Sequence, residues 1–437
     1  MTITNNQQSP EVCLHEQAEV VMRAGLMSLS TGMGSYRVKS VMRIIANALG
    51  ISNKALVTLT EINSTCHVKK GDGHLFNSEV NTISSVGVDS NKIRLIGNLT
   101  KGLKEKKYNH TIDCISTELT KIQNSKPLWN IWFSALWAAV ACVGFTFCIG
   151  GTIFEMFGAF VGSFLGHLSR KIMLKRKYNQ FIVNSLAVCV AEIFYVLLWV
   201  SFSHIPILIN CFQMNSGEQL SGFVGALLFV IPGFPLITGG LDIAKMDFSA
   251  GIQRLVYAIA IILCATTIGA SFAILIGLKI TDLTTPFSGN YVLFTFFRFL
   301  MSGLGVFGFS LMFNSNMKTA LWAGLIGGFA NMGRLILIDF KMSYFLATIL
   351  ATLFVGLAAT VIVKFFDFTR ITLSVPGVLI MIPGSWLFRM SYDLLNQNAV
   401  SALNYGSKAF ATILAMVVGL VIARFLTDKN WRHDYTL

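Results

Sequence analysis

The sequence predicts a mostly α-helical protein that crosses a membrane many times and carries a small α+β domain at its N-terminus. Hydrophobic residues make up 54% of the 437 residues and charged residues only 13%, which is about half the charged fraction of an ordinary soluble domain. The apolar residues are concentrated after residue 128, in runs close to the roughly 20 residues that span a bilayer. One aqueous core could not bury this much apolar surface, so we expect contact with lipid.

Residues 1–128 are expected to form the α+β domain, which ends at Lys126-Pro127. Helical spacing of apolar residues, alternation rich in β-branched residues, and Gly or Asp turn signals define its elements. In chain order we expect two helices within 11–49, a strand at 55–62, a turn at 69–74 followed by a second strand, a third strand at 93–98, and a helix at 113–123.

Ten apolar segments follow, and each is close to the length that crosses the hydrocarbon core. They lie near 131–150, 153–169, 181–203, 219–240, 253–278, 290–312, 318–337, 342–363, 372–391 and 405–426. The first five are assigned to a membrane repeat at 129–280 and the second five to a repeat at 281–437.

The basic residues predict the orientation of these segments. With the N-terminus inside and ten spans, the inner loops receive 13 Lys and Arg residues and the outer edges receive three, Lys279, Lys341 and Lys408. This bias follows the positive-inside rule and accounts for the net charge of +13 without a nucleic-acid partner. The first residues lack the pattern of a cleavable signal. We therefore expect a multi-pass protein of the cell inner membrane with both termini in the cytoplasm.

A short motif occurs once in each half of the membrane region. Ile231-Pro232-Gly233 recurs as Ile382-Pro383-Gly384, 151 residues later, each in the fourth of five segments. Five is an odd number, so the second half should enter the membrane in the opposite orientation, as inverted repeats do in secondary transporters. Pro and Gly interrupt helices, and freed backbone groups inside lipid need protein, water or a ligand. We therefore interpret these breaks, with Pro235 and Ser385 beside them, as a substrate site; a packing kink is the alternative.

Charged and polar residues in or beside the apolar segments are the other candidates, because a charge at the bilayer centre costs about 3 kcal/mol. Glu192, in the third segment, and Asp242, ten residues after Pro232, are candidate proton carriers. Arg298, in the sixth segment, is a candidate anchor for a substrate carboxylate, and Asn331 with Arg334 lies in the seventh. The alternative for each is a structural ion pair or a side chain that reaches the membrane surface.

Several other classes of function lack support in the sequence. The eight Cys residues are scattered singly, which indicates buried apolar residues instead of disulfides or metal ligands. GLGVFG at 303–308 lies in an apolar segment without a preceding strand, so it is not a dinucleotide site. The absence of a Walker loop argues against an ATP-driven pump, and no cofactor or metal is expected. A passive channel and an enzyme remain alternatives, the second with candidate groups in the N-terminal domain: His15, Cys66, His67, Asp72 and His74.

Five stretches carry a family resemblance. They are AEVVMRAGLMSLSTGMGSYRVKSVMRIIANALGI (18–51), LVTLTEI (56–62), FVIPGFPLITGGLDIAKMDFSAGIQRL (229–255), GVFGFSLMFNSNMKTALWAGLIGGFANMGRLIL (305–337) and VPGVLIMIPGSWLFRM (375–390). In these the chain resembles the threonine/serine exporter family of bacterial inner-membrane transporters. In some relatives the two halves are separate proteins, and here they appear fused.

The resemblance implies a soluble cytoplasmic domain, ten spans, and export of threonine or serine, or of succinate in the split type, driven by the proton-motive force. The implied partners are a small substrate, protons and the lipid bilayer, while homo-oligomer formation stays open. The matching positions are Pro232, Gly233, Pro235, Asp242, Asn314, Asn331, Arg334, Pro383 and Gly384. Trp386 and Arg389 stand where relatives often carry smaller or uncharged residues, which bears on the identity of the substrate.

Overall fold

The computed structural model describes residues 10–70, 73–205, 220–278 and 290–432. Asp72 and Lys279, named above, lie outside these ranges. The chain divides into two compact units. We call Met1–Lys126 with Leu241–Arg254 the N-terminal unit, and Pro127–Gly240 with Leu255–Leu437 the helical unit. The division of the membrane region at residue 280 stays a prediction.

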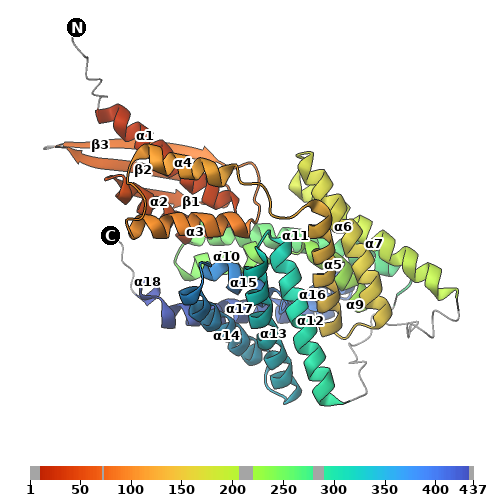
Figure 1. Ribbon diagram of the computed structural model, residues 1–437. Helices are drawn as coiled ribbons and strands as arrows, with labels where there is room; N and C mark the ends of the chain where they lie inside the picture. The colour runs from red at the N-terminus through yellow and green to blue at the C-terminus, as the bar shows by residue number, and fades with distance from the viewer. Residues whose placement is uncertain (1–9, 71–72, 206–219, 279–289, 433–437) are drawn as a thin grey trace, which may run out of the picture. The chain divides into compact units, whose positions relative to one another are not determined.

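The described residues of the first part of the N-terminal unit, Met1–Lys126, form four helices and a three-stranded antiparallel sheet, which Figure 1 shows in red to orange. Its elements are α1 (Pro10–Ser30), α2 (Ser35–Ala48), β1 (Ser52–Val57), β2 (Glu61–Lys70), β3 (Gly73–Thr82), α3 (Ser90–Lys104) and α4 (Ile112–Gln123). The strand order is β1-β2-β3. The predicted helix pair within 11–49 is confirmed, and Gly32, at φ +88°, lies in the turn between its helices.

Two strand predictions in this unit need correction. The third strand expected at 93–98 is wrong, because these residues belong to α3. Its apolar residues Ile93, Ile96 and Leu99 are three residues apart and buried on one side, which suits a helix. Asp89 caps this helix by accepting a hydrogen bond from the Lys92 amide at 3.1 Å. The strand expected at 55–62 is two strands, joined by a turn at 58–60.

The helical unit contains the predicted apolar segments, apart from Leu241–Arg254 at the adjoining ends of α10 and α11, which belong to the N-terminal unit. Its elements are α5 (Ile131–Cys148), α6 (Ile153–Lys175), α7 (Gln180–Ser203), α9 (Leu220–Leu227), the 3₁₀ turn η1 (Leu228–Val230), α10 (Gly233–Ala244), α11 (Phe248–Leu275), α12 (Tyr291–Met312), α13 (Met317–Asp339), α14 (Tyr344–Phe365), α15 (Arg370–Leu379), α16 (Gly384–Leu395), α17 (Ala399–Thr427) and α18 (Lys429–Arg432). Side chains cap many of these helices; Thr152, for example, forms a capping box with Glu155 at the start of α6.

Among the described residues, seven helices are long and apolar enough to cross a membrane, and two bent helix pairs raise the number to nine. The chain is therefore a multi-pass membrane protein. The predicted second segment is present as α6, but Glu155, His167 and Arg170 lower its apolar content. The tenth span consequently stays a prediction.

Helices α5 and α12, the first of each predicted repeat, cross antiparallel at two glycines. A Cβ atom built on Gly144 would lie 2.4 Å from the carbonyl oxygen of Met301, and one built on Gly308 would lie 2.4 Å from that of Trp137. Only glycine permits backbones to approach this closely. The contact is reciprocal, since Gly308 and Met301 each lie 164 residues after Gly144 and Trp137.

Candidate functional site

The two Pro-Gly breaks have the same backbone hydrogen bonds. In each, the glycine amide donates to the isoleucine carbonyl two residues earlier at 2.8 Å, from Gly233 to Ile231 and from Gly384 to Ile382. This pattern is a γ-turn centred on the proline. In each break the amide three residues after the glycine also donates to the proline carbonyl at 3.1 Å. The chain bends by 68° at the first break and by 51° at the second.

The breaks also contact each other in the helical unit. A Cβ atom on Gly233 would lie 2.4 Å from Cδ2 of Leu379, and one on Gly384 would lie 3.5 Å from Cδ1 of Leu228. Leu228 and Leu379 are 151 residues apart, as the two glycines are. The structure therefore brings both predicted breaks together through a reciprocal contact. Pro232, Pro235, Pro383 and Ser385 lie in these same turns and in the first turns of α10 and α16.

Glu192 of α7 is fully buried beside the broken helices. Its relative exposure is 0%, and neither carboxylate oxygen has a hydrogen-bond partner among the described residues. A Cβ atom on Gly269 of α11 would lie 3.1 Å from Glu192 Oε1, 2.8 Å from Leu227 and 3.0 Å from Phe388. Leu227 belongs to the first broken pair and Phe388 to the second. A buried carboxyl in this setting is stable only if it carries a proton or gains a cation.

Asn331 and Arg334 of α13 form a polar cluster next to the second break. Arg334 is 6% exposed; its Nε donates to Asn331 Oδ1 at 3.0 Å and its Nη1 to the Tyr344 hydroxyl at 3.0 Å. Asn331 in turn donates to Ser302 Oγ at 2.8 Å. The Tyr344 ring lies 4.6 Å from that of Trp386, two residues after Gly384. Within the described chain Arg334 has no carboxylate partner, and the acceptors of its hydrogen bonds are both uncharged.

Arg298 of α12 forms an ion pair with a residue of the next helix. Its guanidinium forms an ion pair with Asp339 of α13, and its Cζ lies 4.3 Å from the centre of the Phe294 ring. Tyr291 donates a further hydrogen bond to Asp339 at 3.1 Å. This is the structural ion pair that the sequence left as the alternative. The role of Arg298 as a substrate anchor stays a prediction.

Asp242 lies in the N-terminal unit, whereas the other ten predicted site residues lie in the helical unit. Its Oδ2 atom accepts a hydrogen bond from the Ser35 amide at 3.0 Å and lies 3.3 Å from Nε of Arg254. The Asp242 and Arg254 side chains are 0% and 1% exposed. Nearby, Lys39 pairs with Asp247 at 2.6 Å. These contacts hold the segment after the first break against α2, which favours a structural role for Asp242 over proton transfer.

Comparison with known proteins decides the family. One model of threonine/serine exporters, ThrE, matches residues 19–279, and a second, ThrE_2, described as threonine/serine exporter, matches residues 298–426. The chain belongs to the threonine/serine exporter family. The predicted resemblance is thus confirmed, and both matched regions lie in one chain. No curated protein and no solved structure matches the sequence at a significant level.

In this exporter-family chain, sequence reasoning overlooked buried polar residues of α6. Glu155 accepts hydrogen bonds from the Thr152 amide at 2.8 Å and from the Gly222 amide at 3.1 Å, so it joins the start of α6 to α9. The Thr-x-x-Glu spacing of a capping box was the signal for it. His167 is 0% exposed and lies beside Ser134, with 3.1 Å between Nε2 and Oγ. The signal for His167 is its position, because it lies 164 residues before Asn331 and the same offset separates Gly144 from Gly308.

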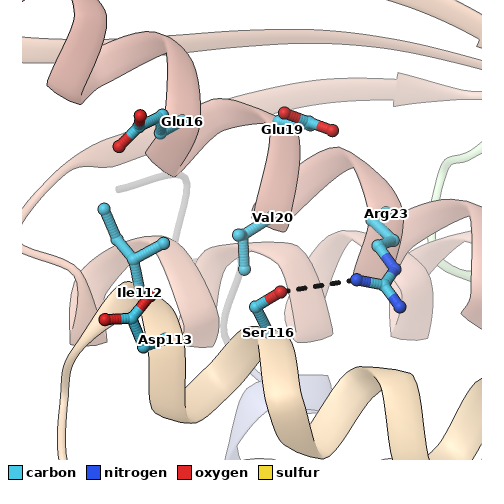
Figure 2. A pocket seen from close by; sticks show the side chains of 7 residues that line it. All are labelled: Glu16, Glu19, Val20, Arg23, Ile112, Asp113 and Ser116. Atoms are coloured by element: carbon cyan, nitrogen blue, oxygen red, sulfur yellow. Dashed lines mark hydrogen bonds between the residues drawn. The ribbon is translucent and has the colours of Figure 1, made fainter.

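A pocket of about 480 Å³ lies between α1 and α4 of the N-terminal unit (Figure 2). Its lining consists of Glu16, Glu19, Val20, Arg23, Ile112, Asp113 and Ser116. Arg23 donates from Nη2 to Thr120 at 2.8 Å and to Gln123 at 2.7 Å, which ties α1 to α4.

Cys66, one of the candidate enzymatic groups, lies elsewhere in this unit and is buried. Burial raises the pKa of its thiol, which makes a nucleophilic thiolate scarce.

Proposed function

We propose that this protein is a proton-driven secondary exporter of threonine or serine, which works by alternating access in the bacterial inner membrane with both termini in the cytoplasm. The observation that carries the proposal is the pair of Pro-Gly breaks, which have matching hydrogen bonds and contact each other inside the helical unit. Paired broken helices are the usual setting of a substrate site in secondary transporters. Membership of the exporter family supplies the substrate class.

An amino acid carries a carboxylate and an ammonium group. A partner for the carboxylate lies beside the second Pro-Gly break. Arg334 is a buried guanidinium without a carboxylate partner in the described chain, and Tyr344 links it to Trp386 beside the break. In the proposed site Arg334 binds the substrate carboxylate, since a guanidinium can donate two parallel hydrogen bonds to one. The C-terminal ends of the half-helices before the breaks suit the ammonium group.

Glu192 is the proposed proton carrier. It lies beside both broken helices and has no partner that would fix its charge among the described residues. A carboxyl that gains a proton from one side of the membrane and loses it to the other would couple proton entry to substrate export. Asp242 is the weaker candidate, because Arg254 already neutralises it.

Alternating access is proposed to arise from two inverted five-helix repeats, and ten spans are required for them. Two reciprocal contacts support this arrangement. One is the antiparallel crossing of α5 and α12 at Gly144 and Gly308, and the other is the contact between the breaks at Gly233 and Gly384. A two-fold relation between the halves produces such pairs, in which residue i meets j and the counterpart of i meets the counterpart of j.

The test is flux through the purified protein in sealed vesicles. We expect the Pro232→Ala, Pro383→Ala double variant to lose most gradient-driven threonine or serine flux, because alanine lets a continuous helix close over the freed backbone groups. Pro376→Ala is the matched control, since Pro376 lies inside α15 and outside the γ-turn. Undiminished flux in the double variant would remove the broken-helix mechanism. Succinate in place of the amino acids tests the alternative substrate, and flux that stops at equilibrium would indicate a channel.

A further inference from the structure

The two halves can be aligned through their second helices as well as through their breaks. Gly144 and Gly308 occupy matching places in the α5–α12 crossing and are 164 residues apart. The capping residues of the next helices, Thr152 of α6 and Asn316 of α13, are separated by the same 164 residues. Helix α6 therefore aligns with α13 without a gap. This register places Arg170 at the position of Arg334 and His167 at the position of Asn331.

The surroundings of Arg170 resemble those of Arg334. Its Nε donates to the side-chain oxygen of Asn184 in α7 at 2.8 Å, just as Nε of Arg334 donates to an asparagine oxygen. Tyr257 of α11 lies within electrostatic reach of the Arg170 guanidinium, whereas the Tyr344 hydroxyl accepts a hydrogen bond from Arg334. No described carboxylate pairs with Arg170. In both halves an asparagine oxygen accepts a hydrogen bond from Nε of the guanidinium, and the described residues supply no carboxylate partner for it.

His167 adds an unused polar group to this cluster. Its ring is fully buried, and Nδ1 has no hydrogen-bond partner among the residues that the structure describes. The ring packs edge-on against Phe229 at the first break, with 5.7 Å between the centroids. The cluster of Arg170, Asn184 and His167 therefore reaches the first break through His167, and the Arg334 cluster reaches the second through Tyr344 and Trp386. A buried donor or acceptor without a partner is costly unless a ligand or water completes it.

We propose that Arg170, Asn184 and His167 form a second binding station for the substrate carboxylate, on the cytoplasmic side of the membrane. The inference rests on the proposed function, in which Arg334 binds that carboxylate. In the orientation predicted from the charge count, the Arg170 end of α6 lies inside and the Arg334 end of α13 lies outside. In an inverted repeat the halves exchange conformations, so equivalent residues meet the substrate in turn. The substrate is held at Arg170 when the site is open inward and at Arg334 when it is open outward.

The test compares substrate affinity from the two faces. Threonine transport is measured in inside-out vesicles, which expose the cytoplasmic face, and in right-side-out vesicles, which expose the opposite face. We expect Arg170→Gln to raise the KM at the cytoplasmic face about tenfold, the equivalent of about 1.4 kcal/mol, and to leave the outer KM nearly unchanged. Arg334→Gln should do the opposite. Lys175→Gln removes a charge from the same end of α6 and should leave both KM values nearly unchanged.

Two further comparisons separate a binding station from a charge that merely orients the helix. Arg170→Lys keeps the positive charge but loses the planar fork, so the cytoplasmic KM should still rise about fivefold or more. Threoninamide lacks the carboxylate, so its inhibition of wild-type transport from the cytoplasmic face should be weak and should not change in Arg170→Gln.

Each remaining result has one meaning. Wild-type cytoplasmic KM values in both Arg170 variants, with a raised outer KM in Arg334→Gln, would overturn the second station and leave the proposed function intact. A cytoplasmic KM that is normal in Arg170→Lys and raised only in Arg170→Gln would assign Arg170 to charge alone and would also overturn it. No flux of threonine or serine through the wild-type protein would remove the proposed function and this inference with it.

Discussion

Gly308→Ala tests the close crossing of α5 and α12. The new Cβ atom would lie 2.4 Å from the carbonyl oxygen of Trp137 and 3.0 Å from the Cβ atom of Ala141. Both neighbours are held by helical backbone, so the helices must separate instead of a side chain turning away. Overpacking of this kind costs about 1–3 kcal/mol. Alanine also gains about 1 kcal/mol in helix propensity over glycine, which opposes that cost.

Gly333→Ala is the matched control, because a Cβ atom on this helical glycine meets nothing within 4 Å. Both variants gain the same helix propensity, so the difference between them isolates the helix contact. We expect Gly308→Ala to be less stable than Gly333→Ala by about 1–3 kcal/mol, measured as the free energy of unfolding in mixed micelles of rising SDS content. Gly144→Ala should match Gly308→Ala, since its Cβ atom would lie 2.4 Å from a carbonyl oxygen too. Equal stability of Gly308→Ala and Gly333→Ala would refute the crossing.

Three other predictions follow from buried groups. Glu192→Gln should abolish accumulation driven by a proton gradient and retain exchange of threonine across the membrane; accumulation at the wild-type level would contradict the proton role. Asp242→Asn should destabilise the N-terminal unit by about 3–5 kcal/mol, because it removes the negative charge that lies 3.3 Å from Nε of the buried Arg254; faster proteolysis of this unit in the whole protein would report it, and an unchanged rate would speak against it. Burial raises the pKa of Cys66, so iodoacetamide at neutral pH should alkylate it at least about tenfold more slowly than the partly exposed Cys13; similar rates, read by mass spectrometry, would contradict the burial.

The local parts of the fold could be predicted from the sequence because their causes are local. Proline and glycine place the two breaks at the predicted residues, and runs of apolar residues place the long helices. A short apolar run is ambiguous, however, and the segment 93–98 fits a strand until Ile93, Ile96 and Leu99 are seen as one helix face. This ambiguity is inherent in runs of about six residues.

The sequence names candidate site residues but not the residues that surround them. A lone charge in an apolar run marks Glu192 and Arg298 as candidates. Their surroundings, however, come from other helices, such as α13, which supplies Asp339 to Arg298. The relation between Arg170 and Arg334 was hidden for another reason. Their helices are 164 residues apart, whereas the breaks are 151 apart, because the first half carries a longer connection before its fourth segment. A single offset therefore cannot align both regions.

One measurement tests the central claim, proton-driven export of threonine or serine, most directly. The purified protein is sealed into inside-out vesicles with an acidic lumen, and labelled threonine is supplied outside at neutral pH. Proton-coupled export predicts that threonine accumulates in the lumen above its outside concentration and that the accumulation collapses when a protonophore is added. Threonine and serine that only equilibrate across the membrane, with or without the pH gradient, would contradict it.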